Sequence, residues 1–289
     1  MTGIAILLSL AMGGIVGVTS GLLGIGGGIL MVPFLYFLMG ATVWSGIAVP
    51  VEHQAALAHA TSLAVIVPAA YSGLLAFRRM GVVPWRAVLP LGAAASLAAL
   101  VGARVAISLP TPFLKLAFGA FALVSGYRLL RRRSDVERAP GDGREAGRGR
   151  SEVPLRIALP GGGAVGFLSA LLGVGGGIVA IPILVRWARL ELRRVVPASL
   201  AIIVFAAPAG VLSYALAGGI PGLPPGSVGY VHLPSALAMI PGAVLLAPLG
   251  ARWNQRIGTG VLRLMFGSLL LVVGLQLVLA NGAQVIRGF

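Results

Sequence analysis

The sequence predicts an all-α polytopic membrane protein made of two inverted repeats, each with about five hydrophobic segments. Hydrophobic residues fill 58% of the 289 positions, charged residues only 10%, and the mean hydropathy is +0.99. This balance excludes an ordinary soluble domain. Apolar runs long enough to cross the ~30 Å hydrocarbon core recur along the chain. A glycine-rich segment at 20–33 returns almost unchanged at 169–182, which indicates a duplication.

The apolar runs form two sets of five, on either side of an arginine-rich stretch. The first set is Gly3–Ser20, Ile29–Met39, Leu57–Phe77, Ala87–Leu109 and Phe113–Leu130. The second set is Ile157–Leu172, Ile178–Val185, Val195–Ala217, Leu233–Gly250 and Val261–Ala280. We therefore expect a first transmembrane repeat over residues 1–130, a flexible cytoplasmic linker over 131–155 and a second repeat over 156–289.

Matches outside the glycine segments support the duplication. The tripeptide Gly102-Ala-Arg104 recurs as Gly250-Ala-Arg252. The same offset of 148 then aligns eight identical residues between 114–129 and 262–277. A further match pairs Ala60-Thr61-Ser62 with Pro197-Ala198-Ser199. One register held over this length indicates repeats rather than chance.

The arginines predict that the two repeats are inverted. Lys and Arg are enriched in cytoplasmic loops, so we place the linker and the arginine-bearing loops near 78–86, 186–194 and 252–256 inside. The loops at 40–56 and 218–231 then lie outside, as do both termini. Only Arg104 and Lys115, in an expected outer loop, do not fit. The net charge of +15 follows this topology, and no basic helix or aromatic stripe indicates nucleic-acid binding.

The duplicated glycines predict broken or re-entrant hairpins that meet near the midplane. A helix from Gly177 to Arg186 covers about 14 Å, roughly half the hydrocarbon thickness. Consecutive glycines weaken a helix, and unwound backbone at this depth is tolerated where it lines a cavity. A full crossing with an interfacial loop is the alternative. Scattered glycines such as Gly13, Gly14 and Gly17 are expected to permit close helix packing.

Two helix N-termini aimed at one cavity favour an anion, because they present free N–H groups and positive dipole ends. Short hydroxyl side chains near the loops can donate further hydrogen bonds, although each can instead bond to its own helix. A histidine there can carry a proton, contact the solute or simply fill the packing. The candidate substrate-binding residues are Ser20, Gly24, Gly26, Gly27, Gly28, His59, Thr61, Ser62, Ser169, Gly173, Gly175, Gly176, Gly177 and Ser199.

The glycine loops followed by proline, the Ala-Thr-Ser element and the Gly-Ala-Arg elements resemble the sulfite exporter TauE/SafE family of membrane permeases. The resemblance covers nearly the whole chain except the linker. It implies a transporter for sulfite or an organosulfur anion such as a sulfonate, and alternating access around a fixed site is the expected mechanism. The family's Gly-Thr-Ser pattern reads Ala60-Thr61-Ser62 in one half and Pro197-Ala198-Ser199 in the other, so a threonine hydroxyl is present once.

Other function classes are less well supported by the residues. A permease for another small carboxylate or inorganic anion stays open. A membrane-bound enzyme is disfavoured, because the chain has no cysteine, no His/Glu metal-ligand spacing and no nucleophile with a nearby base. A scaffold would not need breaks in both halves. We expect no cofactor or metal, and we expect the lipid bilayer and a small anion as partners. We also expect the protein to reside in the cell (inner) membrane of a bacterium. The sequence does not determine the oligomeric state, and a homodimer is one option.

Overall fold

The computed structural model describes residues 1–40, 45–131, 154–186, 190, 192–218, 221–254 and 260–286. These residues form helices and one short antiparallel hairpin. The first half contains α1 (Gly3–Leu23), α2 (Gly28–Gly40), the 3-10 turn η1 (Val51–His53), α4 (Gln54–Arg79), α5 (Trp85–Ser108) and α6 (Thr111–Arg131). The second half contains α7 (Leu155–Leu172), α8 (Gly177–Arg186), α9 (Leu192–Ala215), β1 (Ser227–Val228), β2 (Val231–His232), α10 (Leu233–Asn254) and α11 (Gly260–Ile286).

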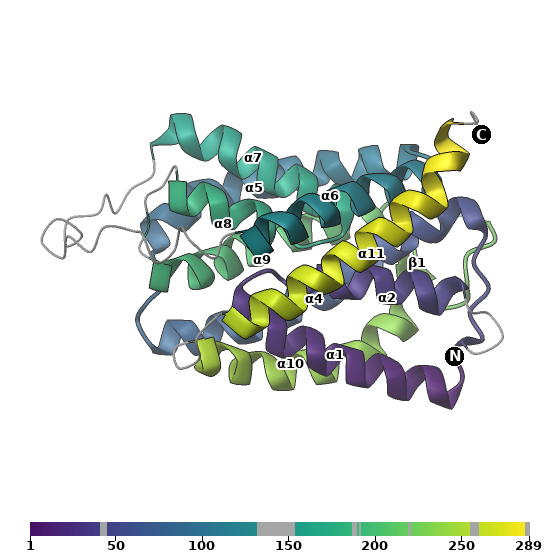
Figure 1. Cartoon of the computed structure of the whole chain (residues 1–289), viewed down its shortest axis with the longest axis horizontal. Helices are drawn as coiled ribbons and strands as arrows, with labels where there is room; N and C mark the ends of the chain where they lie inside the picture. The colour runs from purple at the N-terminus through teal and green to yellow at the C-terminus, as the bar shows by residue number, and fades with distance from the viewer. Residues whose placement is uncertain are drawn as a thin grey trace, which may run out of the picture.

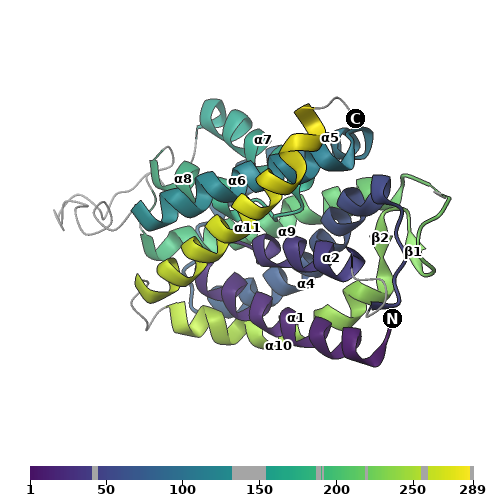
Figure 2. The same cartoon turned by 45° about the vertical axis from the view of Figure 1, so that its right-hand side comes forward.

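Helices from the two halves alternate in space. In Figures 1 and 2, α1 and α10 lie side by side along one edge, and α5 and α7 lie along the opposite edge. Helices α4 and α9 pack on each other between these edges, and α6 packs on α11. Each half therefore packs its first helix against the helix of the fourth segment of the other half.

Small residues allow the closest of these helix contacts. A Cβ atom added to Gly13, Gly17 or Gly21 of α1 would lie within 3 Å of a backbone oxygen of α10. Gly162 and Gly166 of α7 meet the backbone of α5 in the same way. Close backbone approach through small residues is how membrane helices pack when lipid removes the hydrophobic driving force. The packing role expected for Gly13 and Gly17 is confirmed.

Apolar side chains cover the outside of the bundle. Leu7, Leu97, Leu245 and Leu279 are each more than 65% exposed, which is unfavourable in water but suits a lipid environment. Six helices in the described part of the chain are long and apolar enough to cross a membrane. They are Gly3–Leu23, Val51–Arg79, Trp85–Ser108, Leu155–Leu172, Arg194–Ala215 and Leu233–Asn254. The chain is thus an all-α multi-pass membrane protein.

The start of α1 and the end of α11 lie at one end of the molecule, together with the β1–β2 hairpin (Figure 1). We call this the terminal end. Helix α7 begins at the opposite end, so α1 and α7 run in opposite directions. The inverted placement of the halves relative to a bilayer stays a prediction. The linker at 131–155 lies almost wholly outside the described residues.

The helices differ from the expected segments mainly at their ends. The difference at α5 and α6 changes where two basic residues lie. Helices α5 and α6 are separated only by Leu109 and Pro110. Arg104 and Lys115, expected in an outer loop, lie within helices α5 and α6 instead. Arg104 is exposed, whereas Lys115 is half-buried. The placement of Arg104 and Lys115 in an outer loop is therefore wrong.

Candidate functional site

Two glycine loops with the same backbone conformation interrupt the bundle. Loop 1 (Gly24–Gly27) joins α1 to α2, and loop 2 (Gly173–Gly176) joins α7 to α8. The first, third and fourth residues of loop 1 have φ angles of 67°, 83° and 75°, and those of loop 2 have 66°, 82° and 78°. Positive φ at three of four positions explains why both loops need glycine there.

The loops touch each other near the middle of the bundle. A Cβ atom added to Gly28 would lie 2.5 Å from the carbonyl oxygen of Gly173, and one on Gly177 would overlap the carbonyl oxygen of Gly24. Ile66, midway along α4, lies 3.5 Å and 3.1 Å from the Cβ positions of Gly26 and Gly175. Because α4 spans the bundle, the two loops meet at about half its height.

Ser62 and Ser199 tie each loop to a helix of the other half. The Oγ of Ser62 on α4 donates to the carbonyl oxygen of Gly173 over 2.8 Å. The Oγ of Ser199 on α9 donates to the carbonyl oxygen of Gly24 over 2.7 Å. Both serines are fully buried. Their hydroxyl hydrogens are thus used to hold the loops in place and are not available to a solute in this structure.

The loops retain a set of unsatisfied donors. Among the described residues, no acceptor bonds the backbone N–H groups of Gly26–Ile29 or of Gly175–Ile178. The Oγ atoms of Ser20 and Ser169 are also buried with no hydrogen-bond partner in the described chain. The Cβ of Ser169 lies 3.1 Å from the Cβ position of Gly176, beside these amides. Buried donors without a protein partner are rare, and ordered water or a bound ligand ordinarily satisfies them.

A polar cluster lies between loop 2 and the terminal end. Nε2 of His59 and the hydroxyl of Tyr36 are 2.6 Å apart. The His59 ring stacks on Phe118 at a centroid distance of 6.3 Å, and its backbone packs against Gly173. The ammonium of Lys115 donates to Oε1 of Gln54 over 3.0 Å and sits 5.3 Å from the centroid of the Tyr36 ring.

Thr61 is engaged by the hairpin of the other half. Its Oγ1 accepts a hydrogen bond from the backbone N–H of His232 at 3.0 Å, and Nδ1 of His232 lies 2.7 Å from the Oγ of Ser235. Burial lowers the pKa of His232, and the positive N-terminus adds to this shift. The hairpin thus packs a histidine against the same helix that carries His59 and Ser62.

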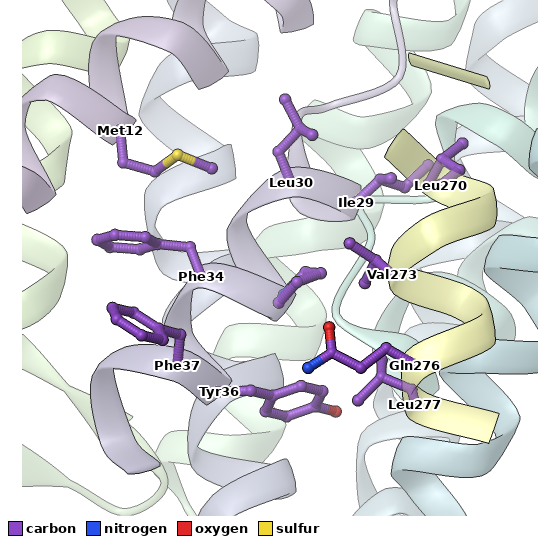
Figure 3. A pocket seen from close by; sticks show the side chains of 11 residues that line it. Met12, Ile29, Leu30, Phe34, Tyr36, Phe37, Leu270, Val273, Gln276 and Leu277 are labelled. Carbon is purple, nitrogen blue, oxygen red and sulfur yellow. The ribbon is translucent and has the colours of Figure 1, made fainter. Parts of the chain in front are cut away.

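A cavity of about 450 Å³ borders the loop region along α2 (Figure 3). Its wall runs along α2 from Ile29, the second residue of that helix, to Phe37, and continues on α11 at Gln276. The hydroxyl of Tyr36 and the amide of Gln276 are the polar side-chain groups of an otherwise apolar lining. The cavity therefore links the glycine-loop end of α2 to the cluster around His59.

Residues 9–277 match the sulfite exporter TauE/SafE family. The chain belongs to this family. It is 29% identical over 273 residues to the "Probable membrane transporter protein MJ0441" of Methanocaldococcus jannaschii, covering 94% of this chain and 95% of the relative. YunE of Bacillus subtilis is 27% identical over 92% of this chain and 95% of its own. A probable membrane transporter protein of Haemophilus influenzae is 26% identical over 95% of this chain and 98% of its own length. No solved structure matches the chain.

This TauE/SafE transporter brings most of the sequence-predicted residues together. The eight glycines, Ser62 and Ser199 meet where the loops touch, and Ser20 and Ser169 lie in the last turns of the helices that lead into them. His59 contacts loop 2, whereas Thr61 faces the hairpin. Whether a solute binds these residues stays a prediction.

Sequence reasoning missed Tyr36, Gln54 and Lys115 in this TauE/SafE protein. Tyr36 sits in an apolar run that shows no pattern of its own, and its partner His59 lies 23 residues away. Lys115 had a detectable signal, since a lysine among apolar residues is a functional candidate in a membrane protein. This lysine lies inside both the predicted segment Phe113–Leu130 and the observed helix α6.

Proposed function

We propose that this transporter carries a small oxyanion, sulfite or an organosulfur anion such as a sulfonate, through a site at the paired glycine loops. The observation that supports this most strongly is the set of eight backbone N–H groups and two hydroxyls left without partners in and beside the touching loops. The family description names sulfite, while the relatives are named only as probable membrane transporters.

An oxyanion suits these donors for two reasons. Leaving a buried donor unpaired costs about 1–3 kcal/mol, so a group with several acceptor oxygens can recover a large sum. The N-termini of α2 and α8 also concentrate partial positive charge at the loops. A cation or a neutral apolar solute would gain neither interaction.

The location between the halves suits alternating access. Each half contributes one loop, and Ser62 and Ser199 fasten each loop to the opposite half. Rocking of one half against the other would expose the same bound anion first to one face and then to the other. Transport is then uniport or is coupled to proton movement through His59 or Glu52.

The serines without partners provide the sharpest test. We expect the S20A–S169A double variant to raise the half-saturating sulfite concentration for flux into proteoliposomes by about tenfold, equivalent to about 1.4 kcal/mol. S9A is the matched control, because Ser9 is also buried without a partner but lies 11 residues before Ser20 on α1. Sulfite flux that is unchanged in the double variant, or absent from the wild type, contradicts the proposal.

A permease for a different small carboxylate or inorganic anion is the second candidate. The unpaired amides recognise negative oxygen in general and do not select sulfur. Competition of sulfite flux by sulfonates, acetate and phosphate at constant ionic strength separates the two. Stronger competition by a carboxylate than by any sulfonate would favour the second candidate.

We also propose that the linker faces the cytoplasm and the terminal end faces outward across the cell (inner) membrane. The arginines at the ends of α4 and α6, Arg78, Arg79, Arg128 and Arg131, support this orientation, because positive residues are retained on the cytoplasmic side. The rival orientation would place this positive charge outside.

A further inference from the structure

Lys115 is a cation in an unusual place for a transporter helix. It lies in the second turn of α6 and is half-buried, yet its side chain turns inward to Gln54 and the face of Tyr36. A lysine that only anchored the helix would extend its ammonium toward the headgroups. The inward direction indicates that the charge serves the interior of the protein.

No carboxylate in the described part of the chain balances this charge. All contacts of the Lys115 ammonium are with neutral groups, the amide of Gln54 and the aromatic ring of Tyr36. Glu52 is the sole acidic residue among the described positions, and its side chain is exposed. A partly buried charge is costly unless it is paired, and a mobile anion would supply the partner that the described part of the chain lacks.

The surroundings of Lys115 add positive potential. Helices α4 and α6 both begin beside it, at Gln54 and Thr111, and helix N-termini carry partial positive charge. A continuous series of contacts then leads inward from Lys115 to the ring of Tyr36, from the Tyr36 hydroxyl to His59, and from His59 to Gly173 of loop 2.

We infer that Lys115, with Gln54 and Tyr36, forms a second anion site that loads the glycine loops from the terminal end. The inference rests on the proposed function, since it places a waiting site on the same route. Its ligand class is a small oxyanion, held by the ammonium and handed on past His59. The positive charge of Lys115 selects the anion and raises its local concentration at this site.

The second half repeats the charge but not the cluster. The offset of 148 that aligns the last helices in sequence pairs Arg263, in α11, with Lys115. The positions equivalent to His59 and Tyr36 are Val196 and Val185, and Val196 packs against Gly24 as His59 packs against Gly173. The polar loading site is therefore one-sided, which gives the two faces of the transporter different anion affinities.

Binding of sodium sulfite to the purified full-length protein tests this inference. Stabilisation against thermal unfolding is measured at constant ionic strength for the wild type, K115M and K115R. We expect K115M to raise the half-saturating sulfite concentration about tenfold and K115R to raise it less than about threefold, because the charge is kept. R104M, which removes an exposed arginine from the neighbouring helix, should match the wild type.

The outcomes separate this inference from the proposed function. K115M that binds sulfite as the wild type does, or a wild type that sulfite does not stabilise, overturns the loading site. Lys115-dependent binding in a protein that carries no sulfite flux supports the site and contradicts the proposed function instead. If K115M does not fold, K115Q replaces it, and the same two comparisons decide.

Discussion

Two pairs of buried serines flank the glycine loops, and they have different partners. Ser62 and Ser199 donate across the interface between the halves to loop carbonyls. Ser20 and Ser169 have buried hydroxyls with no partner in the described chain. The first pair therefore holds the loops, while the second pair is available to a bound anion.

Stability measurements on the same residues should separate these roles. Removing a hydroxyl that satisfies a buried carbonyl leaves that carbonyl unpaired, so S62A or S199A should lower the free energy of unfolding by about 1–3 kcal/mol. S20A and S169A remove no hydrogen bond and should change it by less than about 0.5 kcal/mol. Equal thermal stabilities of all four variants, measured without anion, would contradict this division of roles.

The sequence identifies all four serines but cannot sort them. The acceptors of Ser62 and Ser199 lie 111 and 175 residues away along the chain, a pairing that depends on how the halves pack. The same limit applies to Thr61, whose partner is the backbone of His232. Lys115 was assigned to an outer loop although the predicted segment Phe113–Leu130 contains it, and its contacts with Gln54 and Tyr36 depend on how α6 packs against other helices.

At the scale of elements, the ten predicted hydrophobic segments all correspond to helices, because long apolar runs in a membrane have few alternatives. The β1–β2 hairpin was not foreseen, since its strands are two residues each and show no alternation. The glycine loops were foreseen because three consecutive glycines weaken a helix. Their contact with each other is a property of the elements, made by Gly28 and Gly177, which start α2 and α8.

Alanine at these two glycines should force the loops apart. The Cβ of G28A or G177A would overlap backbone of the opposite loop, so each change should cost about 1–3 kcal/mol of unfolding free energy and reduce sulfite flux. Both positions lack a positive φ, so an alanine there adds no backbone strain to the measured change in stability.

G163A in α7 is the control. A Cβ atom added at Gly163 would have no neighbouring atom within 4 Å, so G163A should raise the free energy of unfolding by up to about 1 kcal/mol. G28A with wild-type stability and flux would show that the loops do not touch.

At the scale of the whole molecule, the orientation can be read from the two ends of α5. Met80 precedes this helix and Ser108 ends it, both are exposed, and the helix between them spans about 36 Å. The chain has no native cysteine, so M80C and S108C each carry a single thiol. We expect an impermeant maleimide to label S108C on intact cells and M80C only after permeabilisation. The reverse pattern contradicts the proposed orientation.

The molecule as a whole joins two interrupted halves so that the interruptions meet at mid-height, where the donors they leave unpaired can share one anion. A crystal structure with bound selenite, a heavier analogue of sulfite, tests this most directly. We expect an anomalous selenium peak between the loops, with selenite oxygens about 3 Å from amide nitrogens of Gly26–Ile29 or Gly175–Ile178. The account would be contradicted if selenite at saturating concentration bound elsewhere in the bundle and made no contact with these amides.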